Sequence, residues 1–240
     1  MLSGPPVTAA ATPEALLERF QAASPRQRRS LLPQLERQAD ALRPLIADVL
    51  AAADATGDDW ACGALIQLLT AVEGSFREAH FAAYPEGWLS TPSACGIDYN
   101  PLQRQLVLQR FEEADRITST ILRELAGEEA VRRGYVYYSE VPPMAPADLE
   151  TLDRLWVVYS RGRFGFSVQG RLLEACNGRW DLLWPKLGWK NGSQWTRYPA
   201  SFTWSIDAPE GHMPLVNQLR GVRLMDALLR HPALHQRIRA

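Results

Sequence analysis

The sequence comprises 240 residues, of which 46% are hydrophobic and 22% charged, with a formal net charge of -1 at pH 7. This length suffices for one large domain or two small ones, and the composition is that of a globular protein, not a disordered or membrane protein. The nearly neutral charge argues against nucleic-acid binding, because neutralising phosphates requires a basic surplus. A local surplus begins at Arg220, after which the chain is rich in arginine and Asp226 is the only acidic residue.

The cysteines and the start of the chain bear on its compartment. Cys62, Cys95 and Cys176 are odd in number and widely spaced, which excludes a disulfide framework and a Cys-x-x-Cys metal site and is typical of a reducing compartment. No run approaches the ~18 consecutive apolar residues of a membrane-spanning helix. Residues 1–13 have neither the cationic start of a secretory signal nor the arginines of a transit peptide. We therefore expect a soluble, cytoplasmic protein.

The first third of the sequence has the apolar spacing of packed helices. Apolar residues recur every three or four positions in two runs, Leu31, Leu35, Leu42, Ile46 and Val49, and then Leu65, Leu68, Leu69, Val72 and Phe76. Pro33 and Pro44 interrupt the first run, so we expect short antiparallel helices there. Asp58 and Asp59 are placed to start the next helix. Residues 1–90 are predicted to form a small helical bundle that serves as a docking module.

Turn-forming residues separate this bundle from the rest of the chain. The segments 84–87 and 91–96 contain prolines and glycines that end regular structure, so we place a domain boundary near residue 90. A larger second domain is expected over residues 97–240. It begins with a predicted helix from Leu102 to Leu125, whose apolar residues mostly share one side.

The middle of the second domain alternates turns and helices. Tyr135 to Tyr138 favour a short strand by propensity. Pro146 lies near the first turn of a well-marked helix. The apolar face of that helix consists of Leu149, Leu152, Leu155, Trp156 and Tyr159. A further helix is expected to be capped by Ser167 and to end at Asn177-Gly178.

No group of residues predicts catalysis or metal binding. His231 and His235 are one helical turn apart, but a proline lies between them and no carboxylate follows. His80 has no local nucleophile signature with Cys62 or Cys95. The carboxylates are scattered over solvated helix faces without a recognisable acid–base pair. We therefore predict a protein that is not an enzyme and has no catalytic or metal-binding residues.

An ordered string of motifs between about residues 100 and 230 points to a known family. The motifs are the run from Asp148 to Gln169, which includes Arg161-Gly162-Arg163-Phe164-Gly165-Phe166, then Gly188–Lys190, Trp195–Pro199, Phe202–Ser205, Ala208–Pro214 and Asn217–Arg223. This string strongly resembles the core signature of the genomes-uncoupled porphyrin-binding family, the accessory proteins that stimulate magnesium chelatase. A helical bundle before the core is similar to the bacterial type. Phe111 stands where a tryptophan is expected, and segment 128–146 is longer and richer in proline than usual.

The resemblance implies an all-α fold, a small N-terminal helical bundle followed by a larger core shaped like a cupped hand. An apolar palm would hold protoporphyrin IX or Mg-protoporphyrin IX, and residues 189–214, here called the wall loop, would form a flexible wall. It implies a monomer without an obligatory cofactor that partners the large porphyrin-binding subunit of magnesium chelatase in chlorophyll biosynthesis. Peripheral membrane association of that complex is a further expectation.

The wall loop contains aromatic residues that suit stacking on a macrocycle and prolines that prevent regular helix. The candidate porphyrin-binding residues are Trp189, Trp195, Tyr198, Phe202, Met213, Asn217, Arg220 and Arg223. Arg220 and Arg223 are three residues apart on a helix expected to begin near Pro214, where two guanidinium groups can meet two propionates. In the resembling family, arginines at these two positions are also linked to porphyrin binding.

Alternatives remain open at the level of residues and of function. Helical spacing among leucines favours core packing for Trp156, Trp180 and Trp184. For Trp189, core packing and ligand contact both remain open. The arginines could instead continue a solvated basic face to Arg230 and beyond. The alternative function is a helical protein-interaction scaffold that has lost ligand binding; a tetrapyrrole-modifying enzyme ranks third.

Overall fold

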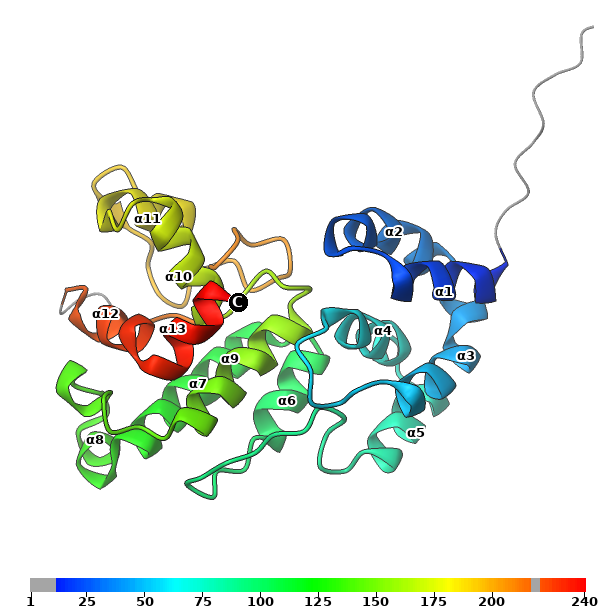
Figure 1. Cartoon of the computed structure of the whole chain (residues 1–240), viewed down its shortest axis with the longest axis horizontal. Coiled ribbons are helices and arrows are strands. Elements are labelled where there is room, and N and C mark those ends of the chain that lie inside the picture. Colours follow the sequence, from blue (N-terminus) through cyan, green and yellow to red (C-terminus); the bar gives the residue numbers. More distant parts are fainter. Residues whose placement is uncertain (1–11, 217–220) are drawn as a thin grey trace, which may run out of the picture. The chain divides into compact units, whose positions relative to one another are not determined.

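The structure, a computed structural model, describes residues 12–216 and 221–240 (Figure 1). Within these residues the regular structure is almost all helix, with only one two-stranded hairpin, which confirms the predicted all-α fold class. The chain divides into two compact units after Ala53. Each unit is described by itself below.

The first unit consists of three helices in its described part, α1 (Pro13–Ala22), α2 (Pro25–Arg37) and α3 (Ala39–Ala52). Local capping explains where the first two begin. The Thr12 side chain accepts a hydrogen bond from the N–H of Ala15, and Ser24 and Gln27 form a capping box. The buried residues of the helices are Leu16, Leu17, Phe20, Arg28, Leu31, Leu35, Leu42, Ile46 and Leu50.

The short helices expected here are present, but they do not break at the prolines. Pro33 lies inside α2 and Pro44 inside α3, and the chain turns instead at Gln38. A proline inside a helix removes one backbone hydrogen bond but leaves its neighbours able to pack. Leu35 and Leu42, on either side of the turn, are both buried.

The second unit contains all remaining elements of the described chain. They are α4 (Trp60–Thr70), α5 (Ser75–Ala83), α6 (Asn100–Val107), α7 (Phe111–Ala126), α8 (Glu128–Arg133), the 3-10 helix η1 (Tyr138–Glu140), α9 (Pro146–Tyr159), α10 (Phe166–Ala175), α11 (Trp180–Lys186), β1 (Lys190–Asn191), β2 (Gln194–Trp195), α12 (Arg223–Arg230) and α13 (Pro232–Arg239). Asp59 caps α4 as predicted, since its carboxylate accepts a hydrogen bond from the N–H of Ala61 (2.9 Å).

The division after Ala53 differs from the boundary that the sequence suggested near residue 90. Helix α4 belongs to the second unit because it packs closely against α9. The Gln67 amide donates to the carbonyl oxygens of Tyr159 (2.6 Å) and Leu106 (3.2 Å). A Cβ atom added at Gly63 would lie only 2.3 Å from the Val158 carbonyl oxygen, so only glycine permits this approach.

The turn-forming segment 84–96 is therefore a loop within the second unit and not a linker. The N–H of Leu89 donates to the Gln103 side chain (2.8 Å), and the N–H of Ala94 donates to the buried Asp148 carboxylate (2.9 Å). Hydrogen bonds from the loop backbone to side chains of α6 and α9 therefore hold the loop in place. Prolines and glycines in a sequence indicate a turn, but they do not distinguish a loop that is anchored in this way from a linker between domains.

Two further expectations for this region are wrong. The helix predicted from Leu102 to Leu125 is two helices, α6 and α7, because Gln109 adopts a left-handed conformation (φ 54°) that ends the first. Tyr135 to Tyr138 do not form a strand; the chain enters η1 at Tyr138. Arg133 holds this turn by donating to both carboxylate oxygens of Glu140 (2.9 and 2.7 Å).

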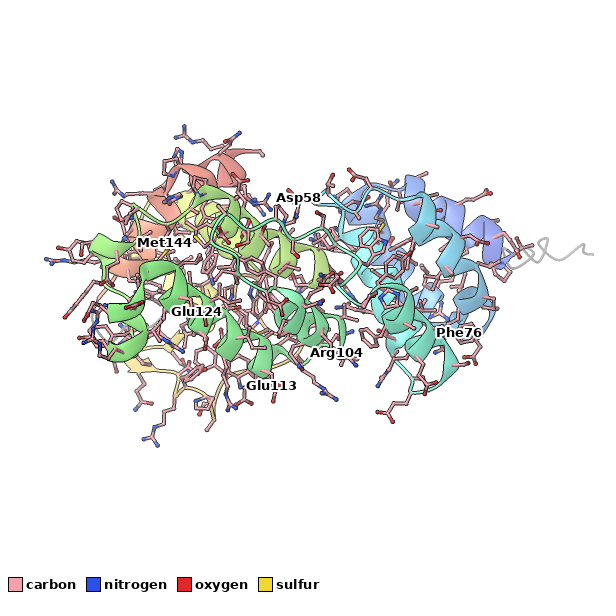
Figure 2. The ribbon with its side chains drawn as sticks, turned by 90° about the horizontal axis from the view of Figure 1, so that it is seen from below. Asp58, Phe76, Arg104, Glu113, Glu124 and Met144 are labelled. Carbon is pink, nitrogen blue, oxygen red and sulfur yellow. The ribbon has the colours of Figure 1, made fainter. Side chains whose placement is uncertain are left out.

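Helix α9 is the centre of the second unit, and α4, α6, α10 and α13 pack against it (Figure 1). Its predicted apolar face is buried throughout. Asp153 on the same helix is fully buried and accepts hydrogen bonds from the N–H of Ser167 (2.8 Å) and the guanidinium of Arg237 (2.7 Å). Asp153, and not Ser167, thus caps α10. Arg237 also reaches Asp58, a loop residue labelled in Figure 2.

The wall loop leaves α11 through the short hairpin β1–β2, in which Lys190 pairs with Trp195. Residues 214–216 are not helical, and α12 begins at Arg223. The helix expected to begin near Pro214 therefore does not start there. Arg220 lies outside the described residues, so its placement beside Arg223 stays a prediction.

Candidate functional site

Four tryptophans form a cluster where α11 meets the wall loop. The ring centroids of Trp184 lie 5.2 Å from Trp180, 5.8 Å from Trp189 and 5.7 Å from Trp195. Trp189 is only 1% exposed, and its indole N–H donates to the carbonyl of His212 (2.8 Å). Trp195 is 43% exposed at the other side of the cluster. Trp189 is therefore a core residue in this conformation, whereas Trp195 presents its ring to solvent.

A second aromatic cluster lies further along the wall loop. Tyr198 contacts Phe202 and Trp204 edge-on, with ring centroids 5.6 and 5.8 Å away, and Phe202 stacks on Trp204 (5.5 Å). The Trp204 indole donates to the carbonyl of Pro199 (3.0 Å). Tyr198 remains 44% exposed and Phe202 is half-buried. The rings thus support each other while part of Tyr198 stays accessible.

His212 connects the two clusters, a role that the sequence interpretation missed. Its ring lies 4.8 Å from that of Phe202, and its carbonyl accepts the Trp189 indole N–H. Its Nδ1 donates to the Leu187 carbonyl (2.5 Å), which leaves Nε2 to accept the N–H of Thr203 (3.3 Å). Burial lowers the pKa of His212, which favours this neutral form. His212 lies in the motif Gly-His-Met-Pro, which drew attention to the segment but did not indicate which residues the imidazole contacts.

Asp115 on α7 is the second residue that sequence reasoning missed. It is 1% exposed, and its carboxylate accepts hydrogen bonds from the Tyr198 hydroxyl (3.2 Å) and the N–H of Leu215 (2.6 Å). Burial raises the pKa of Asp115 to about 6, although both hydrogen bonds oppose the shift. The signal was its position: Asp115 shares the buried side of α7 with Phe111 and Thr118 at helical spacing.

Met213 and its neighbours attach the end of the wall loop to α10. Met213 is fully buried, and its carbonyl accepts the N–H of Gly165 (3.0 Å). The Gln169 amide donates to the carbonyls of Gly211 (3.0 Å) and Pro214 (2.7 Å). Met213 thus packs in the core in this structure.

The predicted cationic residues are only partly described. Arg223 is exposed at the first position of α12, and its guanidinium carbon lies 5.4 Å from the centre of the Tyr138 ring. Asn217 and Arg220 lie outside the described residues. The residues Trp189, Trp195, Tyr198, Phe202 and Met213 share one loop, whereas the aromatic contact of Arg223 is with Tyr138 outside that loop.

Other candidate sites lie away from the wall loop. Cavities of about 200 and 340 Å³ are lined by residues around Arg154 and around His80, respectively. Among residues 12–216 and 221–240 there is no cluster of three or more side chains suited to hold a metal ion. No helix in the same ranges combines the length and apolarity needed to cross a membrane. The exposed aromatic rings of the wall loop are the feature best suited to a flat apolar ligand.

The fold and this loop define an all-helical protein with a long aromatic segment between α11 and α12. Residues 92–232 match the model of the family described as GUN4-like, which spans more than half of the chain. The chain belongs to the GUN4-like family, which confirms the resemblance seen in the sequence.

Curated relatives and solved structures are similar over the same region. The chain is 52% identical over 153 residues to a Ycf53-like protein from Synechocystis sp. (64% of this chain, 66% of that protein). It is 37% identical over 144 residues to the chloroplastic tetrapyrrole-binding protein of Arabidopsis thaliana (56% and 54%). The chain thus covers less than two thirds of the length of these relatives.

Two solved structures share the fold of this region. GUN4 from Chlamydomonas reinhardtii superposes with a TM-score of 0.57 and 39% identity, covering 60% of this chain and 95% of that one. Ligand-free GUN4 from Arabidopsis thaliana gives a TM-score of 0.54 with 38% identity, covering 58% and 99%. Each match covers nearly all of the solved chain and leaves about two fifths of the present chain unmatched.

Proposed function

We propose that the chain binds protoporphyrin IX and Mg-protoporphyrin IX and stimulates magnesium chelatase in chlorophyll biosynthesis. The observation that carries this proposal is the wall loop, whose connected aromatic rings leave Trp195 and Tyr198 accessible to a flat ligand. Membership of the GUN4-like family supports it, as does the name of the Arabidopsis relative, a tetrapyrrole-binding protein.

The energetics of a porphyrin fit a site of this kind. Burying roughly 300 Å² of the apolar disc contributes about 7 kcal/mol, from which association subtracts several kcal/mol. Burial of the disc alone therefore falls short of the roughly 8 kcal/mol that micromolar binding needs, so the protein rings that it covers and cations near the two propionates must add affinity. Arg223 is accessible for this role, and we propose Asn217 and Arg220 as its neighbours in the site.

The other parts of the proposal concern partners and location. We propose that the protein acts as a cytoplasmic monomer without an obligatory cofactor and without an enzymatic activity of its own. Its partner would be the large porphyrin-binding subunit of magnesium chelatase, in a complex that associates peripherally with membranes. The nearly neutral net charge supports a role without nucleic acid.

A magnesium chelatase assay tests the proposal. The purified chain is added to the chelatase with limiting protoporphyrin IX, and the initial rate of magnesium insertion is measured. We expect a saturable increase in that rate and no conversion of porphyrin by the chain alone. Porphyrin binding without any increase would contradict the role in the chelatase reaction. The absence of both binding and stimulation would favour the helical scaffold.

A substitution tests the proposed role of Arg223. Arg223→Ala should weaken binding of deuteroporphyrin about fivefold, because an exposed guanidinium contributes modestly to carboxylate binding. Its effect on the dimethyl ester, which lacks the charges, should be less than twofold. Arg230→Ala on the same helix is the control, since Arg230 is also exposed and pairs with Asp226 (2.9 Å). Equal losses for acid and ester would show that Arg223 does not bind propionates.

A further inference from the structure

One buried carboxylate binds two distant points of the segment that carries the proposed porphyrin contacts. Asp115 accepts a hydrogen bond from the Tyr198 hydroxyl with Oδ2 (3.2 Å) and from the Leu215 N–H with Oδ1 (2.6 Å). Tyr198 lies in the middle of the wall loop and Leu215 directly follows its end. Both are thereby fixed against the same turn of α7.

The Tyr198 ring is held on several sides but remains accessible. Its hydroxyl is bound by Asp115, and its ring packs edge-on against Phe202 (76° between planes) and Trp204 (81°). Phe202 is itself supported by the buried ring of His212. Nevertheless 44% of Tyr198 is exposed. An aromatic ring with a fixed orientation and an accessible surface is prepared for stacking on a planar ligand before the ligand arrives.

We infer that Asp115 is a positioning residue for porphyrin binding, which acts through the Tyr198 hydroxyl to hold the ring in its stacking orientation. This inference rests on the proposed function. Without the hydrogen bond the ring rotates and the wall loop samples other arrangements, so that a smaller fraction of molecules is ready to bind. The apparent dissociation constant rises as that fraction falls.

The surroundings of Asp115 fit a specific positioning role. An ionised carboxylate is costly to bury, and donors must offset the lost hydration. The two donors here come from the wall loop and the chain just after it, while the charges of Arg116 and Glu112 act on the pKa of the carboxyl in opposite directions. These two hydrogen bonds therefore stabilise the buried carboxylate in the folded chain, and they hold this segment in place at the same time.

The test is a double-mutant cycle on the full chain, with deuteroporphyrin IX titrated at pH 8 and tryptophan fluorescence as the signal. At this pH the Asp115 carboxyl is ionised, since its pKa is about 6. Tyr198→Phe keeps the ring and removes the hydroxyl, and we expect a three- to tenfold weaker affinity, the net effect of an ordinary hydrogen bond. In an Asp115→Ala background, the same substitution should change the affinity by less than about twofold, because the partner is already gone.

The matched control is Tyr137→Phe. Tyr137 is also 44% exposed, and its hydroxyl pairs with that of another tyrosine, Tyr135 (3.1 Å). If Asp115→Ala does not fold, the comparison of Tyr198→Phe with this control decides the question. Unchanged affinity in Tyr198→Phe, or equal losses with and without Asp115, would overturn the inference alone. Failure of the wild-type chain to bind porphyrin would contradict the proposed function itself.

Discussion

Asp153→Ala is expected to lower the free energy of unfolding by about 3 kcal/mol, because it removes a buried acceptor from two partners at once. The Asp153 carboxylate is 0% exposed and connects α9 to the first turn of α10 through Ser167 and to α13 through Arg237. Without Asp153, the Ser167 N–H loses this acceptor. The Arg237 guanidinium keeps its ion pair with the more exposed carboxylate of Asp58. Gly165 lies against the same carboxylate, where a Cβ atom would come within 2.8 Å of it.

Asp58→Ala is the matched control, because Asp58 pairs with the same guanidinium but its side chain is 52% exposed. An exposed ion pair contributes little, so the expected loss is below about 1 kcal/mol. Urea unfolding followed by circular dichroism measures both variants at neutral pH. Similar losses in the two variants would contradict the account, since burial would then not be what makes Asp153 important.

The second large effect is expected from truncation. A fragment of residues 54–240 should unfold at nearly the same urea concentration as the full chain, whereas a fragment of residues 97–240 should unfold at a lower one, because the latter lacks α4 and α5. Helix α4 buries Leu65 and Ile66 completely. A fully buried side chain of this size contributes about 1.5–3 kcal/mol, so the loss of α4 should lower the stability of the fragment by several kcal/mol. A cooperative transition at the same urea concentration in both fragments would contradict this division of the chain.

A single substitution tests the same packing within the full chain. Gly63→Ala should destabilise it by about 1–3 kcal/mol, since the added Cβ meets the Val158 backbone. Gly57→Ala is the control, because its Cβ would meet chiefly the side chain of Asp54 (3.3 Å). Thermal unfolding of the two variants should therefore differ clearly. A stabilised Gly63→Ala variant, as helix propensity alone predicts, would mean that α4 and α9 are less closely packed.

Local patterns in the sequence were sufficient for most helices but not for the division of the chain. The apolar spacing of α9 and the position of Asp59 before α4 predict both elements correctly. The segment 84–96 resembles a linker because its prolines and glycines are visible in the sequence. The hydrogen bonds that anchor it come from Gln103 and Asp148, and such distant partners leave no local signal.

In the candidate site too, the sequence predicts some features and not those that depend on distant partners. Composition predicts an aromatic wall loop, and Trp195 and Tyr198 are indeed accessible there. It cannot predict that Trp189 is buried, because this depends on a hydrogen bond to His212 across the loop. Asp115 escaped notice because acidic residues on helices are usually solvated, and its partners lie on a distant part of the chain.

Titration of the full chain with deuteroporphyrin IX, followed by tryptophan fluorescence, tests the central claim most directly. The reporters are already in place, since four of the tryptophans cluster beside the wall loop. The account predicts saturable quenching with a dissociation constant in the micromolar range or below, from burial of the disc and of the protein rings that it covers together with charged hydrogen bonds to the propionates. Quenching that does not saturate, or none at concentrations about a hundredfold above that range, would contradict porphyrin binding by this protein.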